Sequence, residues 1–338
     1  MDAPRVALVL GGGAARGLAH IGALEVLEGE GIRPAFVGGA SMGGLVAALW
    51  AAGVDARGLR EAARGFRFPR WFVPGGLVAW DRIFAPAVPL LEGATFESLK
   101  TLLAMVAMDV ESGRIVVLHE GAVLPAVRAT CAIPAVLPPI VVGGRLLVDG
   151  GLVNVLPVDI AAMAEPDVIV AVSVRGRRRR EMPVLRRRLA GAGWGLGRYL
   201  PNPVTAWFSF ELAVRSAEIA LERQATLAAA MIGPEVLVEP DVHDLGLRDF
   251  HKLDQAVDAG RRSTEAALPA IRSAIERAAT VRRDRPGGHP PAFTYDPVCQ
   301  MVVTSSSAAA SEVRGGRTYY FCSPGCREAF LRDPGGRP

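Results

Sequence analysis

The chain begins with two short apolar runs that each end in glycine and lead into a segment of helical character. Residues 5–10 are mostly aliphatic and are followed by Gly11, Gly12 and Gly13, whereas residues 36–38 lead into a sharp turn at Ser41. Buried parallel strands have such unbroken aliphatic runs, and glycine permits a tight turn from strand to helix. We therefore expect a layered α/β domain whose central sheet is mostly parallel.

Strand and helix patterns alternate along most of the remaining chain. Apolar periodicity predicts helices over residues 18–30, 42–52 and 123–132, and strands over residues 103–110, 114–118, 145–148 and 168–174. Arginine, proline and glycine replace this periodicity at residues 281–292, which predicts a linker. The expected organisation is a large domain at residues 1–280, the linker, and a small module at residues 293–338.

The composition is that of a globular protein, because 50% of the residues are hydrophobic. Charged residues or Gly-Pro breaks interrupt every apolar run before it reaches the roughly 18 residues that a membrane-spanning helix needs. The first residues precede only a short apolar run, unlike a secretory signal. The sequence therefore predicts a cytoplasmic protein.

The net charge of +4 is small, and much of it comes from one basic cluster that begins at Arg175 and ends at Arg188. Aromatic residues follow between Trp194 and Phe210. Basic clusters attract phosphates, and basic residues beside aromatic ones suit a peripheral membrane contact. The alternative is an ordinary solvated loop. We expect peripheral contact with the inner face of the membrane and no binding of nucleic acid.

Ser41 is flanked by Gly39 and Gly43, between a predicted strand and a predicted helix. A nucleophilic serine on such a turn needs small neighbours, because the strained backbone brings the flanking residues close together. The Gly-x-Ser-x-Gly spacing alone also occurs by chance. Its position after a glycine-rich turn favours a nucleophile that faces backbone N–H donors, which indicates acyl transfer.

The glycine-rich turn at residues 11–17 has a competing interpretation as a nucleotide-binding loop, since both uses place backbone N–H groups at the start of a helix. A Walker loop needs Lys followed by Ser or Thr, where this chain has Arg16 and Gly17. A dinucleotide site needs an acidic residue at the end of the second strand, where this chain has Gly38 and Gly39. An anion hole for an ester carbonyl is therefore favoured.

The base that would activate Ser41 has two interpretations. A histidine oriented by a carboxylate is usual, and His243 or His251 would complete the order Ser, Asp, His of an α/β-hydrolase. Both histidines, however, lie in polar sequence that suits the surface. Asp149 ends an apolar strand and precedes two glycines, which would let its carboxylate approach another turn. An ordinary Asp-Gly turn is the alternative, but the accompanying motifs favour a catalytic Asp149.

Three motifs in this order resemble those of the patatin-like phospholipase family, and the resemblance extends over about residues 5–280. Residues 11–17 resemble its oxyanion motif, residues 39–43 its nucleophile elbow, and residues 149–151 its Asp-Gly-Gly element. The resemblance implies a three-layer α/β/α fold and a Ser41–Asp149 dyad without histidine. It also implies an oxyanion hole formed by Gly12, Gly13, Ala14 and Arg16.

The resemblance further implies a serine acyl hydrolase that cleaves carboxylic esters of phospholipids or lysophospholipids and needs no cofactor for catalysis. Many bacterial relatives have a glycine where this chain has Ala14. If that position requires a positive φ, alanine is strained there. The alternative function is a catalytically weak lipid-binding scaffold whose C-terminal module senses metal.

Three of the four cysteines, Cys299, Cys322 and Cys326, lie within the last 40 residues. Without an export signal, such crowding favours metal ligation or redox chemistry over disulfides. The surrounding sequence resembles the YHS domain, a small treble-cleft-like module related to metal-sensing cysteine domains. The thiolates could bind zinc or Cu(I). A closed zinc site needs a fourth ligand, and the nearest histidine is His289 in the predicted linker; the alternative is a structural module without metal.

Overall fold

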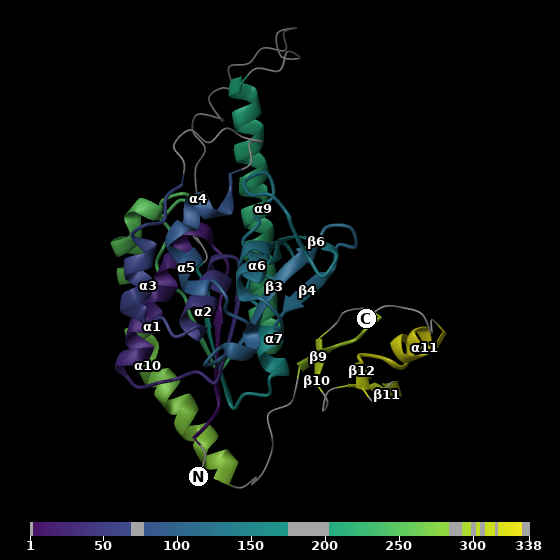
Figure 1. Ribbon diagram of the computed structural model, residues 1–338. Coiled ribbons are helices and arrows are strands. Elements are labelled where there is room, and N and C mark those ends of the chain that lie inside the picture. The colour runs from purple at the N-terminus through teal and green to yellow at the C-terminus, as the bar shows by residue number, and fades with distance from the viewer. Residues whose placement is uncertain are drawn as a thin grey trace.

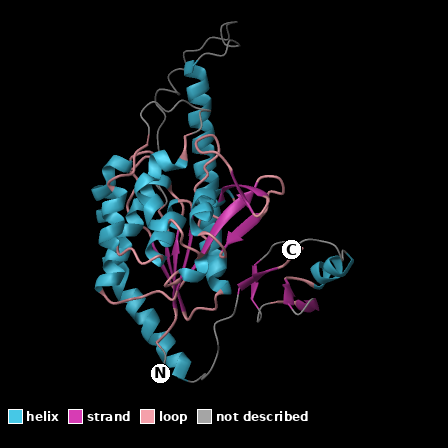
Figure 2. Cartoon of the chain, in the orientation of Figure 1, coloured by secondary structure: helices cyan, strands magenta, loops and turns pink. Residues whose placement is uncertain are grey.

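The computed structural model describes residues 3–68, 78–174, 203–283, 293–298, 302–304, 308–314 and 317–332. Its larger part is a sheet of eight strands with helices on both faces (Figure 1; Figure 2). These strands are β1 (Val6–Leu10), β2 (Phe36–Ala40), β3 (Leu102–Asp109), β4 (Ile115–Leu118), β5 (Ile140–Val142), β6 (Arg145–Asp149), β7 (Val168–Val172) and β8 (Val236–Val238). The α-helices are α1 (Ala19–Gly29), α2 (Met42–Ala51), α3 (Ala56–Ala63), α4 (Trp80–Phe84), α5 (Val88–Leu91), α6 (Val123–Thr130), α7 (Val158–Met163), α9 (Pro203–Ile232) and α10 (Leu253–Arg283). Short 3₁₀ helices include η1 (Ala14–Leu18), η4 (Gly150–Leu152) and η6 (Phe250–Lys252).

The centre of the sheet is parallel and one end of it is antiparallel. The strand order is β5-β6-β3-β2-β1-β7-β8, and β4 also pairs with β3. The pairs β2–β3, β1–β2, β1–β7 and β7–β8 are parallel. By contrast, β4 and β6 are antiparallel to β3, and β5 is antiparallel to β6. Helices connect the parallel strands, which confirms the mostly parallel α/β fold that the sequence predicts.

The side chains of the central strands alternate between two apolar cores, one on each face of the sheet. Along β1, Leu8 and Leu10 belong to the core that α1, α2 and α10 cover, whereas Ala7 and Val9 belong to the core that α7 and α9 cover. Figure 1 shows these two groups of helices on opposite sides of the strands. Alternation with a period of two is what a strand buried on both faces requires. The sheet is therefore the middle of three layers.

Helices α1 and α10 cross at two glycines. A Cβ atom on Gly22 of α1 would lie 1.9 Å from the carbonyl oxygen of Val257, and one on Gly260 of α10 would lie 1.8 Å from that of Ala19. No side chain fits at either position. The two helices therefore pack with their backbones in contact, which fixes α10 against the helix that follows the glycine-rich turn.

The C-terminal module contains, among its described residues, two small antiparallel sheets and a helix. Its elements are β9 (Phe293–Tyr295), β10 (Val302–Thr304), β11 (Ala310–Arg314), β12 (Arg317–Phe321) and α11 (Pro324–Arg332). β9 pairs with β10, and β11 pairs with β12. The buried rings of Phe321 and Phe330 lie 5.3 Å apart, and Arg327 pairs with Glu312 at 2.6 Å. A small apolar core and an ion pair thus hold α11 against the strands.

The strands and helices that the sequence predicts in residues 5–174 are present, with bounds within two residues of those expected. At the other end of the large domain, α10 continues to Arg283 and so includes the first residues of the range predicted as a linker. The basic cluster from Arg175 to Arg188 and Trp194 lie outside the described residues. No helix among the described residues is long and apolar enough to cross a bilayer.

Candidate active site

Ser41 lies on a sharp turn between β2 and α2. Its backbone angles are φ 53° and ψ −126°, a region that side-chain-bearing residues rarely adopt. The turn brings other backbones very close, since a Cβ on Gly43 would lie 2.0 Å from the Leu10 carbonyl oxygen and one on Gly39 would lie 2.6 Å from the Gly43 carbonyl. The tight turn at Ser41 therefore leaves no room for a side chain at either glycine.

The ends of β2 and β6 meet on the same edge of β3. Val106 of β3 pairs with both β2 and β4, and Ala107 pairs with both β4 and β6. Since a strand has only two edges, β2 and β6 must share the edge opposite β4. Parallel β2 ends with Ala40 beside Val106, and antiparallel β6 ends with Asp149 beside Ala107. The fold therefore brings Ser41 and Asp149 to one point from opposite directions.

Ser41 and Asp149 form a buried hydrogen-bonded pair. The Ser41 hydroxyl donates to Oδ2 of Asp149 at 2.6 Å, and Oδ1 of Asp149 accepts the Gly151 N–H at 2.7 Å. Burial raises the pKa of Asp149 to about 6, although the hydrogen bonds from Ser41 and Gly151 oppose this shift. A carboxylate with this pKa can accept a proton near neutral pH. Glycine is required at position 150, between Asp149 and Gly151, because a Cβ atom there would lie 2.1 Å from the Val106 carbonyl oxygen.

The glycine-rich turn packs directly against Ser41. A Cβ on Gly12 would lie 3.3 Å from the Ser41 Cβ. The N–H groups of Gly11 and Gly12 already donate to the carbonyl oxygens of Val172 and Val155, at 3.0 and 2.8 Å. The turn is therefore tied to the strand end of β7 on one side and to the segment after η4 on the other.

The next two N–H groups of the turn are available. Within the described part of the chain, the N–H groups of Gly13 and Ala14 have no hydrogen-bond acceptor. Ala14 has φ 47°, so alanine occupies the left-handed conformation that glycine tolerates best. The sequence predicts Gly12, Gly13 and Ala14 as oxyanion donors. Because the Gly12 N–H is bonded to Val155, the geometry leaves Gly13 and Ala14 as the candidates.

Two further side chains anchor the turn. The buried Arg16, which the sequence places in the oxyanion motif, donates from Nε to the Leu245 carbonyl at 2.8 Å. His20 is fully buried, and its Nε2 lies 2.7 Å from the Gly11 carbonyl oxygen. Desolvation lowers the pKa of His20 to about 4, although the bond to Gly11 opposes it. His20 is therefore neutral at pH 7 and carries its proton on Nε2, where it holds the Gly11 carbonyl.

The histidines considered from the sequence as alternative bases do not accept the hydrogen bond of the Ser41 hydroxyl, which goes to Asp149. His243 pairs with Asp241 at 3.4 Å, and His251 lies in η6. Sequence reasoning missed the role of His20, whose only signal is a single histidine inside a strongly apolar helix.

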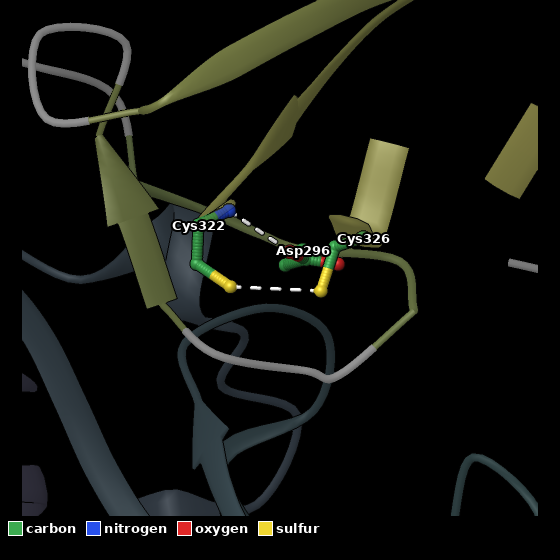
Figure 3. Close-up of side chains that lie close together, drawn as sticks. All are labelled: Asp296, Cys322 and Cys326. Carbon is green, nitrogen blue, oxygen red and sulfur yellow. Dashed lines mark hydrogen bonds between the residues drawn. The ribbon is translucent and has the colours of Figure 1, made fainter. Parts of the chain in front are cut away.

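The C-terminal module brings together Asp296, Cys322 and Cys326, whose potential ligand atoms all lie within 4.8 Å of one another (Figure 3). The two sulfur atoms are 3.7 Å apart. Asp296 is fully buried, and its two carboxylate oxygens accept the N–H groups of Val298 and Cys322, each at 2.9 Å. The structure thus places two of the predicted cysteines together and adds a carboxylate that the sequence did not reveal. Cys299 and His289 lie outside the described residues.

Comparison with known proteins finds two families along the chain. Residues 8–162 match the sequence profile described as patatin-like phospholipase, and residues 294–335 match that of the YHS domain. An uncharacterized NTE family protein of Mycobacterium tuberculosis is 32% identical over 284 residues, which are 78% of this chain and 46% of that relative. The patatin-like phospholipase domain-containing protein 6 of Mus musculus is 29% identical over 282 residues, which are 78% of this chain and 20% of that protein.

The chain therefore spans less than half the length of either relative. Among solved structures, VipD from Legionella pneumophila aligns with 80% of this chain and 67% of its own, at 12% identity and a TM-score of 0.44. That similarity is too weak to support any argument about function.

Proposed function

Because the chain carries a patatin-like phospholipase domain and a YHS domain, we propose that it is a serine acyl hydrolase acting on phospholipids or lysophospholipids. The observation that carries the proposal is the buried hydrogen bond of 2.6 Å from the Ser41 hydroxyl to Asp149. This hydrogen bond lies beside the glycine-rich turn, in which the N–H groups of Gly13 and Ala14 have no acceptor among the described residues. A nucleophile, a base and oxyanion donors are the three components that acyl transfer requires.

In the proposed mechanism, the Ser41 oxygen attacks the ester carbonyl carbon while its proton passes to Oδ2 of Asp149. The negative charge that develops on the carbonyl oxygen is held by the N–H groups of Gly13 and Ala14. When the intermediate collapses, Asp149 returns the proton to the leaving alcohol and the acyl group stays on Ser41. A water molecule then attacks the acyl-enzyme, Asp149 accepts its proton, and the fatty acid is released as Ser41 recovers a proton.

The environment of Asp149 suits this role. Its pKa of about 6 leaves the carboxylate mostly ionised at pH 7 and still basic enough to accept a proton. The bond from the Gly151 N–H holds Oδ1, so Oδ2 is directed at Ser41. The turn around Ser41 keeps the nucleophile in a single strained conformation, which favours a preorganised site.

The test compares the wild-type protein with Ser41→Ala and Asp149→Asn. A fluorophosphonate probe should label the wild-type protein and not Ser41→Ala, and both variants should lose hydrolysis of a lysophospholipid and of a short-chain nitrophenyl ester. Hydrolysis by Ser41→Ala at the wild-type rate would refute the proposal. Binding of lipid vesicles without labelling or hydrolysis would instead support the lipid-binding scaffold.

The cysteine cluster supports a second proposal, that the C-terminal module binds zinc through Cys322, Cys326 and Asp296. Zinc takes sulfur ligands at about 2.3 Å, so two of them in a tetrahedral site lie about 3.8 Å apart. The observed sulfur separation of 3.7 Å matches that geometry. A donor set that includes a carboxylate suits zinc better than Cu(I), which prefers soft ligands alone.

Zinc analysis of the full chain tests this second proposal. We expect about one zinc ion per wild-type chain and a marked loss in Cys326→Ser. The matched control is Cys131→Ala, which removes a cysteine from the other domain and should leave the zinc content unchanged. Equal zinc in Cys326→Ser and the wild-type protein would refute the assignment.

The predicted membrane contact rests on sequence alone, because the basic cluster lies outside the described residues.

A further inference from the structure

Three consecutive residues at the end of α6 contact both members of the candidate dyad. The Ser41 N–H donates to Oγ1 of Thr130 at 3.0 Å, and Sγ of Cys131 lies 3.2 Å from the Ser41 carbonyl oxygen. The Asp149 N–H donates to the carbonyl oxygen of Ala132 at 3.0 Å. One short segment therefore holds the backbone on both sides of the nucleophile and the backbone of the base.

Thr130 occupies the point where β2 and β6 meet on the edge of β3. Its hydroxyl is fully buried and donates to the Val106 carbonyl oxygen at 2.6 Å, while it accepts the Ser41 N–H. Val106 is the last residue of β3 that pairs with β2, and Asp149 pairs with the residue after it. The hydroxyl thus links the residue after β2 to β3. It does so at the position where the partner of β3 changes from β2 to β6.

The neighbouring contacts make the attachment rigid. Burial raises the pKa of the Cys131 thiol well above its ordinary value, with a further contribution from the Asp149 charge, so the thiol keeps its proton and can donate to Ser41. The methyl group of Thr130 packs on α2, because a Cβ on Gly44 would lie 2.9 Å from it. The loop after α6 therefore cannot shift without moving Ser41 or Asp149.

We propose that Thr130 is a positioning residue for the dyad, whose hydroxyl fixes the Ser41 backbone relative to Asp149. This inference rests on the proposed function, since it concerns the same nucleophile and base. Without the hydroxyl, the strained turn at Ser41 loses its link to β3, and the Ser41 N–H and the Val106 carbonyl are left without their hydrogen-bond partner. A misplacement of about 1 Å at a reacting atom can cost about 100-fold in rate.

The experiment compares Thr130→Val, which keeps the branched shape without the hydroxyl, with Thr130→Ser, which keeps the hydroxyl. We expect kcat of Thr130→Val for a short-chain nitrophenyl ester to fall about 10- to 100-fold, with KM changed less than about threefold. Labelling by a fluorophosphonate should slow by a similar factor. Thr130→Ser should restore most of the activity. Because a smaller folded fraction also lowers the apparent kcat without changing KM, kcat is calculated per folded molecule, with the folded fraction taken from circular dichroism.

Thr264 offers a matched control. It is buried in α10, and its hydroxyl donates to the Gly260 carbonyl of the same helix at 2.8 Å. Thr264→Val therefore removes the same group from the same degree of burial, and it should leave kcat and the labelling rate unchanged. All variants are compared at a temperature where circular dichroism shows them folded.

The outcomes separate this inference from the proposed function. Labelling of Thr130→Val at the wild-type rate, or an equal loss in Thr264→Val, would overturn the positioning role and leave the hydrolase intact. Equal labelling of the wild-type protein and Ser41→Ala would overturn the proposed function, and the positioning role with it. If the wild-type protein is labelled but lysophospholipid is not hydrolysed, the substrate class is wrong and the labelling rates still decide the role of Thr130.

Discussion

Asp149→Asn should remove activity and, at neutral pH, increase the stability of the fold. Asp149 is only 5% exposed, and burial raises its pKa from 3.8 to about 6. Burying a carboxylate without a cation costs free energy that the neutral amide does not cost. Asparagine can still accept the Gly151 N–H through its oxygen, and its NH₂ group can donate to the Ser41 hydroxyl. The change therefore removes the charge and retains hydrogen bonding.

The size and the sign of the effect follow from the pKa shift. A shift of about two units corresponds to about 3 kcal/mol between the protonated and ionised forms. Because the folded pKa lies above the unfolded one, the stabilising contribution is fully present below about pH 4 and is lost as the pH rises through 6. At pH 8 the wild-type protein carries the whole cost, whereas at pH 5 it recovers about 1.4 kcal/mol by protonation of Asp149.

Urea unfolding of the wild-type protein and Asp149→Asn at pH 5 and pH 8 measures this effect. We expect the advantage of Asp149→Asn in unfolding free energy to be larger at pH 8 by about 1.4 kcal/mol. Glu61→Gln is the control for loss of one negative charge, since the Glu61 side chain is 73% exposed and its ion-pair partner is an arginine, which is charged at both pH values, and its effect should change little between pH 5 and pH 8. The reasoning is refuted if Asp149→Asn is less stable than the wild-type protein at pH 8 or if the difference does not depend on pH.

Three other measurements test the structure. In the wild-type protein kcat/KM should rise about tenfold per pH unit below 6 and level off above 7, because Asp149 must be ionised to act as a base; a profile flat from pH 4.5 to 8 would contradict this. Ala14→Gly should raise the free energy of unfolding by about 0.5–1 kcal/mol, since it relieves the φ of 47°, and a less stable variant would show that the strain is absent. Gly260→Ala should destabilise the fold by about 2 kcal/mol or more by forcing α10 away from α1. Gly29→Ala should not, because a Cβ atom at that position has no neighbour within 4 Å. Equal thermal midpoints for the two variants would contradict the close crossing.

The elements that could be predicted from the sequence are those with an unbroken local signal. The strand at Val6–Leu10 is continuously aliphatic, and the glycine that follows it marks its end. The motifs at Ser41 and Asp149 follow the ends of such strands, so their positions at the sheet could be predicted with them. The three-residue strand β5 carries no such signal, because Ile140–Val142 is too short for periodicity to be read.

What the sequence could not reveal depends on pairing between distant segments. The availability of the N–H groups in the glycine-rich turn is an example, since Gly12 is excluded only by its bond to Val155. The meeting of β2 and β6 depends on antiparallel pairing between residues about 40 positions apart, which no local pattern encodes. Thr130 left only a weak signal, as one hydroxyl within an apolar stretch, and its role requires both partners to be in place.

The proposed dyad also explains how a serine hydrolase can dispense with histidine. A catalytic base works best when its pKa lies near the working pH, and an exposed aspartate is too weak a base because its pKa is about 4. Burial at the junction of β2 and β6 raises the pKa of Asp149 to about 6, close to that of an ordinary histidine. The same burial makes the ionised carboxylate unfavourable to the fold. If both effects have this single cause, variants that let water reach Asp149 should lower its pKa, weaken it as a base and stabilise the protein at pH 8 at the same time.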